Sequence, residues 1–121
     1  MAKKPDKKKN IKLSAIDEDI LTVLAARELY GLEILDNLNL DREDKLGSKL
    51  GFGSLYPALN RLEKKGFVKW RWGDESDDTG GARRKYYKMT GLGSDVLNSV
   101  REYRTSLAAR GMEGLNGFGG I

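Results

Sequence analysis

The 121-residue sequence contains no cysteine and no histidine, and only two prolines. Without the first two side chains the protein cannot build a disulfide framework, a thiolate zinc site or a nucleophile activated by histidine. Apolar runs are also short, because the longest, residues 20–26, is far below the roughly 20 residues that span a bilayer. The lysine-rich N-terminus has no apolar stretch behind it and does not resemble a secretory signal. The sequence therefore predicts a soluble cytoplasmic protein with no membrane partner.

Motifs for enzymatic chemistry are missing as well. The carboxylate pairs have ordinary surface spacing. The two glycine-rich fragments, residues 51–53 and 91–93, are too short for a phosphate-binding loop and are better interpreted as turns. We therefore expect a non-enzymatic protein with no catalytic residue, no metal and no cofactor.

Basic residues, by contrast, are present and clustered. The chain has 22 Lys and Arg against 18 Asp and Glu, a formal net charge of +4. Residues 1–12 carry six lysines and one aspartate, residues 61–71 carry five basic residues and one glutamate, and residues 83–88 carry four basic residues and no acid. Three basic clusters on one small domain fit a polyanionic partner. A solvated surface of mixed charge is the alternative.

The N-terminal half of the chain predicts two short helices. Residues 1–12, rich in lysine, are expected to form a disordered arm. Ser14 is a candidate N-cap for a helix over about residues 16–28, whose apolar residues follow a helical stripe. A second helix of about two turns should follow Gly31. Residues 39–49 form a polar linker with room for a short helical turn.

The segment Gly53–Gly66 predicts a short basic helix. Three leucines spaced four and three residues apart should face the core, namely Leu55, Leu59 and Leu62. Ser54 is the expected N-cap, Pro57 is expected in the first turn, and Gly66 is expected to end the helix. The opposite face then presents four residues, with Tyr56 at its edge: Pro57, Asn60, Arg61 and Lys64.

A β-hairpin should follow this helix directly. Residues 68–72 alternate apolar and basic side chains with a period of two, and the return strand covers about residues 84–89. The polar residues 73–82 join them as a long tip. Trp70 and Trp72 share one face and are expected to be core residues. A ligand pocket near these two residues and Tyr103 is the alternative.

A helix followed at once by a basic hairpin is the layout of a winged helix. The expected fold is therefore mainly α with a β-hairpin (α+β), a winged helix-turn-helix over residues 13–90 with a C-terminal dimerisation helix. The basic helix would lie in a major groove of double-stranded DNA, with Asn60 on a base edge and Arg61 and Lys64 on guanine or phosphate. Ser54 and Tyr56 would meet phosphates. The wing would contact the DNA backbone or the minor groove through Arg83, Arg84 and Lys85. We expect the acidic residues 74–78 to point away from DNA or to pair with a lysine.

The last helix, residues 91–110, should open near Thr90 or Ser94 and has the most regular apolar periodicity in the chain. Its stripe lies at positions i, i+4, i+7 and i+11, namely Val96, Val100, Tyr103 and Leu107. We expect this stripe to join two copies into a homodimer, which would duplicate the DNA-reading element. An intramolecular core face is the alternative. Residues 111–121 contain five glycines and predict a flexible tail.

Two of these segments resemble the PadR family of bacterial transcriptional regulators. They are Gly53-Ser-Leu-Tyr-Pro-Ala-Leu-Asn-Arg-Leu-Glu-Lys-Lys-Gly66 and Gly81-Ala-Arg-Arg-Lys-Tyr-Tyr-Lys-Met-Thr-Gly91. Residues 30–34 resemble the start of that family's second helix, and the likeness covers about residues 13–107. The acidic wing loop followed by residues 80–84 is also similar to cyanobacterial PadR-like proteins, including the circadian period-extender (Pex) group.

The resemblance implies a winged-helix dimer, usually a repressor, whose C-terminal helix swaps or packs across the two-fold axis. It implies a DNA-facing side of the recognition helix made of Ser54, Tyr56, Pro57 and Asn60, and a wing made of Arg83, Arg84 and Lys85. The single short C-terminal helix is like that of the smaller PadR-like proteins and argues against a large effector pocket.

The leading hypothesis is a homodimeric, sequence-specific DNA-binding repressor. A winged helix that docks onto a protein and never reads DNA is the rival, and a ligand-sensing regulator is a third interpretation. The residues do not specify an effector.

Overall fold

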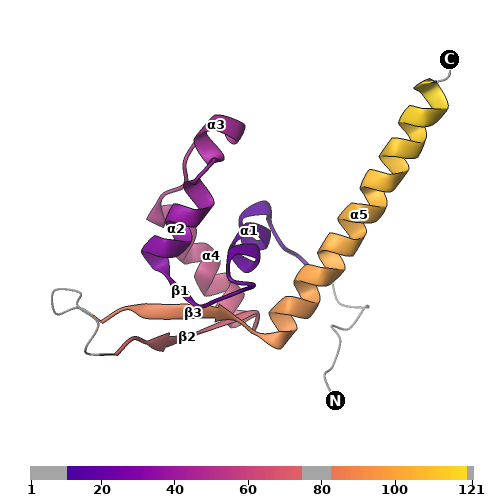
Figure 1. Ribbon diagram of the computed structural model, residues 1–121. Coiled ribbons are helices and arrows are strands. Elements are labelled where there is room, and N and C mark those ends of the chain that lie inside the picture. The colour runs from indigo at the N-terminus through magenta and orange to yellow at the C-terminus, as the bar shows by residue number, and fades with distance from the viewer. Residues whose placement is uncertain (1–10, 75–82, 120–121) are drawn as a thin grey trace.

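The computed structural model describes residues 11–74 and 83–119 of the chain. Figure 1 shows the helices α1, α2 and α4 gathered on one side of a small antiparallel sheet, while the long helix α5 projects away from them. Within the described residues the architecture is therefore mainly α with a β-hairpin, as the sequence predicts. None of the helices in residues 11–74 and 83–119 is long and apolar enough to cross a membrane.

Helix α1 (Ala15–Val23) begins at the predicted cap. Asp17 N donates to Ser14 Oγ at 3.2 Å, and Ser14 N donates to Asp17 Oδ2 at 3.1 Å. These reciprocal bonds satisfy two amide groups that the first turn leaves without a partner. The predicted end at residue 28 is wrong, because the helix stops at Val23. The chain then turns so that Leu29–Tyr30 can pair with the sheet as β1.

Helices α2 (Gly31–Asn39) and α3 (Arg42–Leu46) follow. The helical turn that the polar linker allowed is α3. Asn39 joins the two ends of this linker, since its Oδ1 accepts from Leu50 N at 2.8 Å and its Nδ2 donates to Leu50 O at 2.9 Å. The linker therefore returns the chain to the point where the next helix starts.

Helix α4 (Phe52–Lys64) is the predicted basic helix, but it begins three residues earlier than expected. Gly51 is its N-cap, so Ser54 lies inside the first turn, and Pro57 lies in the helix interior. Pro57 cannot donate to the carbonyl of Gly53, four residues earlier, but both residues are exposed, so water can bind that carbonyl. The predicted end is confirmed: Gly66 has φ +80°, and Phe67 N donates back to Leu62 O at 2.9 Å.

The sheet has the strand order β1-β3-β2. Strands β2 (Val68–Trp72) and β3 (Lys85–Met89) form the predicted hairpin, with Val68 opposite Met89 and Trp72 opposite Lys85. The expectation that both tryptophans are core residues holds in part. Trp70 is half-buried against the core, whereas Trp72 is 47% exposed, because the hairpin extends beyond the helices that cover its base.

The core lies between α1, α2, α4, the inner face of the hairpin and the start of α5. Its fully buried side chains include Ile20, Leu21, Ile34, Leu55, Leu59, Leu62, Val68 and Leu97. The three leucines predicted for the inner face of α4 are all among them. Burial of this stripe fixes which face of α4 remains exposed to solvent.

Helix α5 (Gly91–Gly119) begins just after Thr90, whose Oγ1 accepts from Gly93 N at 3.0 Å. The predicted tail from residue 111 is helical as far as Gly119. Each glycine weakens a helix by roughly 1 kcal/mol relative to alanine, but none of them removes a hydrogen-bond donor as proline does. A long helix that is already nucleated can therefore continue through them.

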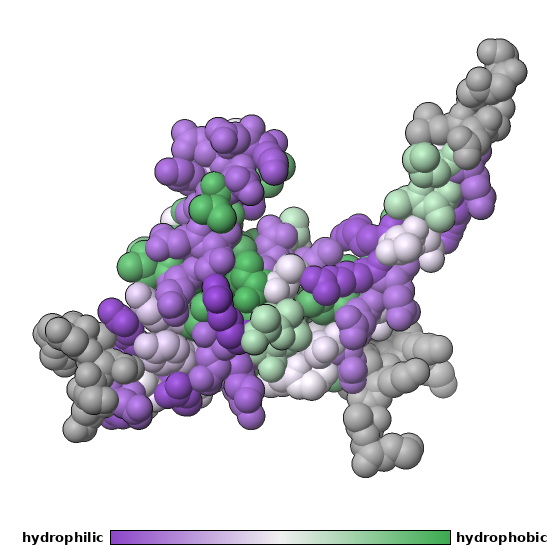
Figure 2. Space-filling view, viewed as in Figure 1, coloured by the Kyte–Doolittle hydropathy of each residue, from purple (hydrophilic) through white to green (hydrophobic). Residues whose placement is uncertain are grey.

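The structure buries one part of the stripe predicted for dimerisation and leaves the other part exposed. Val96 is 1% exposed and packs inside its own chain, so that prediction is wrong for Val96. Val100 is half-buried, while Tyr103 is 56% and Leu107 40% exposed. All side chains described from Arg101 to Gly114 are exposed, and Figure 2 shows pale apolar surface on this projecting part of α5.

Candidate nucleic-acid interface

The exposed face of α4 is polar and narrow. At about 100° per residue, Pro57, Asn60 and Lys64 lie opposite the buried leucines, and all three are exposed. A face of this kind, on a helix that packs its other side into the core, can enter a major groove. The asparagine amide offers both a donor and an acceptor to a base edge.

Arg61 occupies the flank of this face and has a structural partner. Its Nη2 donates to Oδ1 of Asp17 at 3.0 Å, and Asp17 is the one charged residue buried among the described residues. Asp17 also forms the cap of α1. Arg61 therefore ties α4 to the start of α1, rather than extending freely from the helix as the sequence suggested.

Tyr56 lies at the edge of the face and is 42% exposed. Its ring stacks on Phe52, with centroids 5.5 Å apart and planes 18° apart. Its hydroxyl lies so close to Gly31 that a Cβ at that position would be 2.3 Å from the oxygen. A side chain at position 31 would therefore require the tyrosine hydroxyl to move from its place beside the exposed face of α4.

The wing cations lie over aromatic rings. Lys85 Nζ is 4.2 Å from the ring centre of Trp70, and the guanidinium carbon of Arg84 is 4.2 Å from that of Tyr30. Arg83 donates to the carbonyl of Gly73 at 3.3 Å through Nη2. Such contacts orient flexible cations at the root of the wing.

These groups meet around one hollow of about 570 Å³ between α4 and the wing. It is lined by five of the predicted site residues, namely Tyr56, Asn60, Arg83, Arg84 and Lys85. Four further lining residues were not predicted as site residues: Tyr30, Gly31, Trp72 and Tyr87. Burial raises the pKa of Tyr87 above its ordinary value, so its phenol stays protonated. In the sequence, Tyr30–Gly31 was visible only as a break between two helices. That break was the one signal from which this part of the lining of the hollow could have been predicted.

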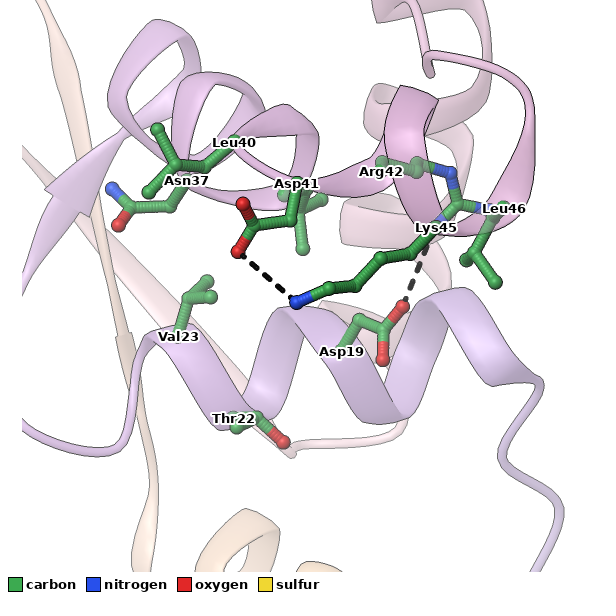
Figure 3. Close-up of a pocket in the computed structure, with 10 residues that line it drawn as sticks. Asp19, Thr22, Val23, Asn37, Leu40, Asp41, Arg42, Lys45 and Leu46 are labelled. Atoms are coloured by element: carbon green, nitrogen blue, oxygen red, sulfur yellow. Dashed lines mark ion pairs between the residues drawn. The ribbon is translucent and has the colours of Figure 1, made fainter.

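A second hollow, of about 400 Å³, lies between α1, α2 and α3 (Figure 3). Its charged residues pair with one another, Arg42 with Asp19 at 3.6 Å and Lys45 with Asp41 at 3.9 Å. These pairs neutralise its charge, so it offers no excess charge to a ligand. The alternative pocket near Trp70, Trp72 and Tyr103 does not match either hollow, because Trp72 lines the first one without Trp70 or Tyr103.

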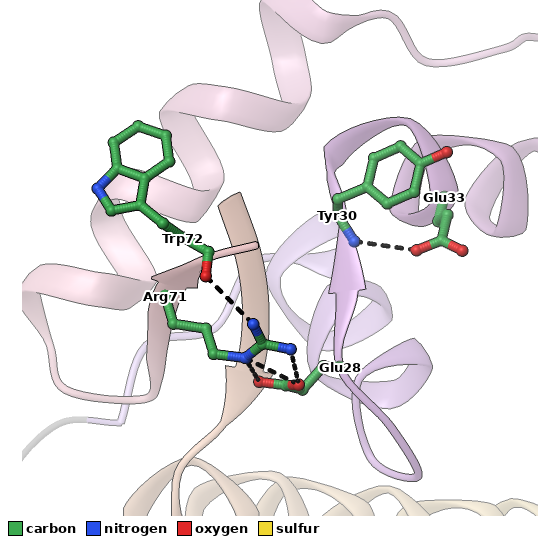
Figure 4. A network of polar contacts seen from close by, with 5 residues as sticks. All are labelled: Glu28, Tyr30, Glu33, Arg71 and Trp72. Atoms are coloured by element: carbon green, nitrogen blue, oxygen red, sulfur yellow. Dashed lines mark hydrogen bonds and ion pairs between the residues drawn. The ribbon is translucent and has the colours of Figure 1, made fainter. Parts of the chain in front are cut away.

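A polar clamp spans the outer face of the sheet (Figure 4). Arg71 on β2 donates to Glu28, just before β1, from Nη2 at 3.0 Å and from Nε at 3.1 Å. The guanidinium lies over Tyr86 on the middle strand, 5.0 Å from the ring centre. The hydrogen bonds from Arg71 hold the pKa of Glu28 below its usual value. The clamp joins the two edges of the sheet and so supports the position of the wing.

The remaining predicted residues lie outside the hollow. Ser54 and Pro57 are exposed in the first half of α4, and Lys64 is exposed at its end. The predictions for the lysine arm up to residue 10 and for the acidic loop beyond Asp74 fall outside the described residues. Within residues 11–74 and 83–119 no three potential metal ligands come together.

The sequence of this chain is similar to those of known proteins. Residues 20–99 match the sequence profile of the Transcriptional regulator PadR-like family. An uncharacterized protein of Lysinibacillus sphaericus is 33% identical over 85 residues, which cover 70% of this chain and 73% of that protein.

Solved structures agree as well. The chain is similar to a PadR-like transcription factor from Bacteroides fragilis, with a TM-score of 0.69, 26% identity, and coverage of 81% of this chain and 87% of the other. It is also similar to a PadR family transcription regulator from Clostridium difficile, with a TM-score of 0.64, 30% identity, and coverage of 87% and 98%. The resemblance to the cyanobacterial subgroup stays a prediction. On its sequence and its fold, this chain belongs to the PadR-like family of transcriptional regulators.

Proposed function

We propose that this regulator is a homodimeric repressor that reads double-stranded DNA with α4 and holds the DNA backbone with its wing, and that it carries out no catalysis. The observation that carries the proposal is the hollow shared by α4 and the wing. A base-reading amide, Asn60, lies across it from the basic residues Arg83, Arg84 and Lys85. A repressor needs no more than stable occupancy of its operator, which such an interface can supply.

The two parts of the interface have different tasks. Contacts to phosphate fix the register and orientation of a protein on DNA, whereas contacts to base edges select the sequence. The wing supplies the first kind through arginine and lysine, and α4 supplies the second through Asn60. Lys64, exposed near the end of α4, extends the positive surface along the same groove.

Sequence selection should depend on Asn60. Replacing Asn60 by alanine is expected to reduce discrimination at one base pair of each half-site by about 1–3 kcal/mol, because a bidentate contact to adenine is lost. Affinity for random DNA should stay close to that of the parent, since no charge changes. Binding to single-base variants of the operator, measured by fluorescence anisotropy, checks this. Unchanged preferences at every position would contradict a base-reading role for Asn60.

Dimerisation is assigned to the projecting part of α5. Its apolar stripe consists of the half-buried Val100 and the exposed Tyr103 and Leu107, and it leaves out Val96, which is buried in its own chain. An exposed tyrosine and leucine on one side of a projecting helix favour a second copy as the partner. Two copies would place two recognition helices about one turn of DNA apart, roughly 34–36 Å.

Leu107→Asp should therefore weaken self-association by about 100-fold or more, because a charge would be placed in an apolar contact. The matched control is Thr105→Asp, which adds the same charge about 200° around the same helix. Analytical ultracentrifugation over a range of concentrations measures both. Equal association of the two variants would show that this stripe does not hold the dimer.

The experiment that tests the proposed function is selection of bound fragments from sheared genomic DNA at near-physiological salt, followed by sequencing. A short motif with two-fold symmetry is the expected result, and reporter expression with and without the protein then tests repression. Recovery of DNA without any motif would contradict sequence-specific reading. Absence of bound DNA would favour the rival, a winged helix that docks onto another protein.

A further inference from the structure

Trp72 is a large apolar side chain held on the surface at the outer end of β2. It is 47% exposed, whereas Trp70, two residues earlier, packs against the core and donates from Nε1 to Glu63 at 2.8 Å. The two indoles meet edge to face, with ring centres 5.2 Å apart and planes 79° apart. An exposed tryptophan fixed in one orientation forms a ready contact surface, and tryptophan dominates the energy of many interfaces.

The charges around the ring indicate the chemistry of its partner. The guanidinium carbon of Arg83 lies 5.8 Å from the ring centre of Trp72, and Lys85 Nζ lies 5.5 Å from it. Lys85 is also the cross-strand neighbour of Trp72. An apolar ring with two cations near it suits a partner that offers negative charge and apolar carbon side by side.

The location of the ring limits the possible partners further. Trp72 lines the hollow between α4 and the wing, together with Asn60 and the basic residues of the wing. When a recognition helix enters a major groove and a wing reaches the adjacent minor groove, one DNA strand separates the two grooves and must run between helix and wing. That strand presents phosphates alternating with deoxyribose rings, whose carbon atoms are apolar.

We propose that Trp72 is a DNA-contact residue, which packs its indole ring against deoxyribose of the strand that runs between α4 and the wing. Arg83 and Lys85, whose charges lie near the ring, bind the adjoining phosphates of the same strand. The inference rests on the proposed function, because it requires α4 and the wing to hold DNA. It adds an apolar contact to an interface that the charges alone would make purely electrostatic.

Two single-tryptophan variants make the proposal measurable, since the chain has only two tryptophans. Trp70→Phe leaves Trp72 as the reporter, and Trp72→Phe leaves Trp70. Each is titrated with a mixed-sequence duplex at low salt, where non-specific binding is strong. Binding is followed separately by the anisotropy of a labelled copy of the same duplex. The access of acrylamide to each indole is measured by fluorescence quenching.

On saturation with the duplex, the quenching constant of Trp72 is expected to fall by a factor of about two or more, because deoxyribose covers the ring, as in other aromatic contacts to nucleic acid. The quenching constant of Trp70 should stay the same. Binding by Trp70→Phe with Trp72 as accessible as in the free protein would overturn the inference and leave the proposed function intact. A parent protein that binds no duplex under these conditions would overturn both.

Affinity provides a second measurement. Trp72→Ala should weaken binding about tenfold, in the range found for loss of an aromatic contact to nucleic acid, with an unchanged salt slope because no charge is lost. Trp72→Phe should recover most of that affinity. Thermal unfolding of both variants should match the parent, since the side chain lies outside the core. Parent-like affinity of Trp72→Ala, or a loss of affinity that follows a loss of folded protein, would overturn the role in binding.

Discussion

Replacing Arg83 and Arg84 together by alanine should weaken binding to every DNA sequence by about 10- to 100-fold, the largest expected effect on DNA binding. Both residues line the hollow beside α4, and Arg83 is positioned there by its bonds to the carbonyl of Gly73. A phosphate contact contributes without regard to sequence and releases counterions. The slope of log affinity against log salt should therefore fall by about 2 if each arginine meets one phosphate.

The matched control removes two positive charges elsewhere. Lys45 on α3 and Lys49 just after it are exposed and pair with Asp41 and Glu43, respectively, and neither lines the hollow beside the wing. Their double alanine variant has the same net charge as the wing variant but should keep both affinity and salt slope near those of the parent. An equal loss in the two variants would mean that net charge, and not the wing, controls binding. No loss in the wing variant would mean that the wing does not meet phosphate.

Gly93→Ala is expected to have the largest effect on stability. A Cβ at Gly93 would lie 2.2 Å from the carbonyl oxygen of Phe67 and 3.0 Å from Met89 Cγ. The oxygen belongs to the backbone between α4 and β2 and already accepts from Thr90 N at 3.0 Å, so it cannot move without breaking the junction of α5 with the winged domain. Overpacking of this kind destabilises by about 3 kcal/mol. For a domain of this size the unfolding midpoint should fall by roughly 10–20 °C.

Gly91→Ala serves as the control two residues earlier in the same helix, because nothing lies within 4 Å of a Cβ there. It should leave the midpoint unchanged or raise it slightly, since alanine favours the helix by up to about 1 kcal/mol. Differential scanning calorimetry compares the two at equal protein concentration, which matters for a protein that associates. A Gly93→Ala variant as stable as Gly91→Ala would mean that α5 can shift away from Phe67 at little cost.

Much of the fold followed from local patterns in the sequence. The leucine spacing of α4, the Gly66 end of that helix and the alternation in β2 each reflect a contact with an immediate neighbour or with one continuous core face. The sequence also contained the family resemblance, and with it the recognition helix and the wing. These features could be predicted because each depends on residues a few positions apart.

Long-range pairing decided the rest. Strand β1 has two residues and no period of its own, and it exists because Leu29–Tyr30 pair with Tyr86–Tyr87. This pairing ended α1 at Val23, five residues before the predicted end. A boundary set by a partner almost sixty residues away in the sequence leaves no local signal.

The site shows the same division. The residue types that suit DNA contact were visible in the sequence, including Asn60 and the basic wing. Only the tertiary structure decided that Arg61 pairs with a buried aspartate, that Val96 belongs to the core and that Trp72 reaches the surface. Each of these outcomes depends on how far a neighbouring helix or strand extends. A side chain stays exposed where the neighbouring element ends before it, and it is buried or paired where that element packs against it. Sequence determines what a side chain can bind, and packing determines which of its potential partners lies within reach.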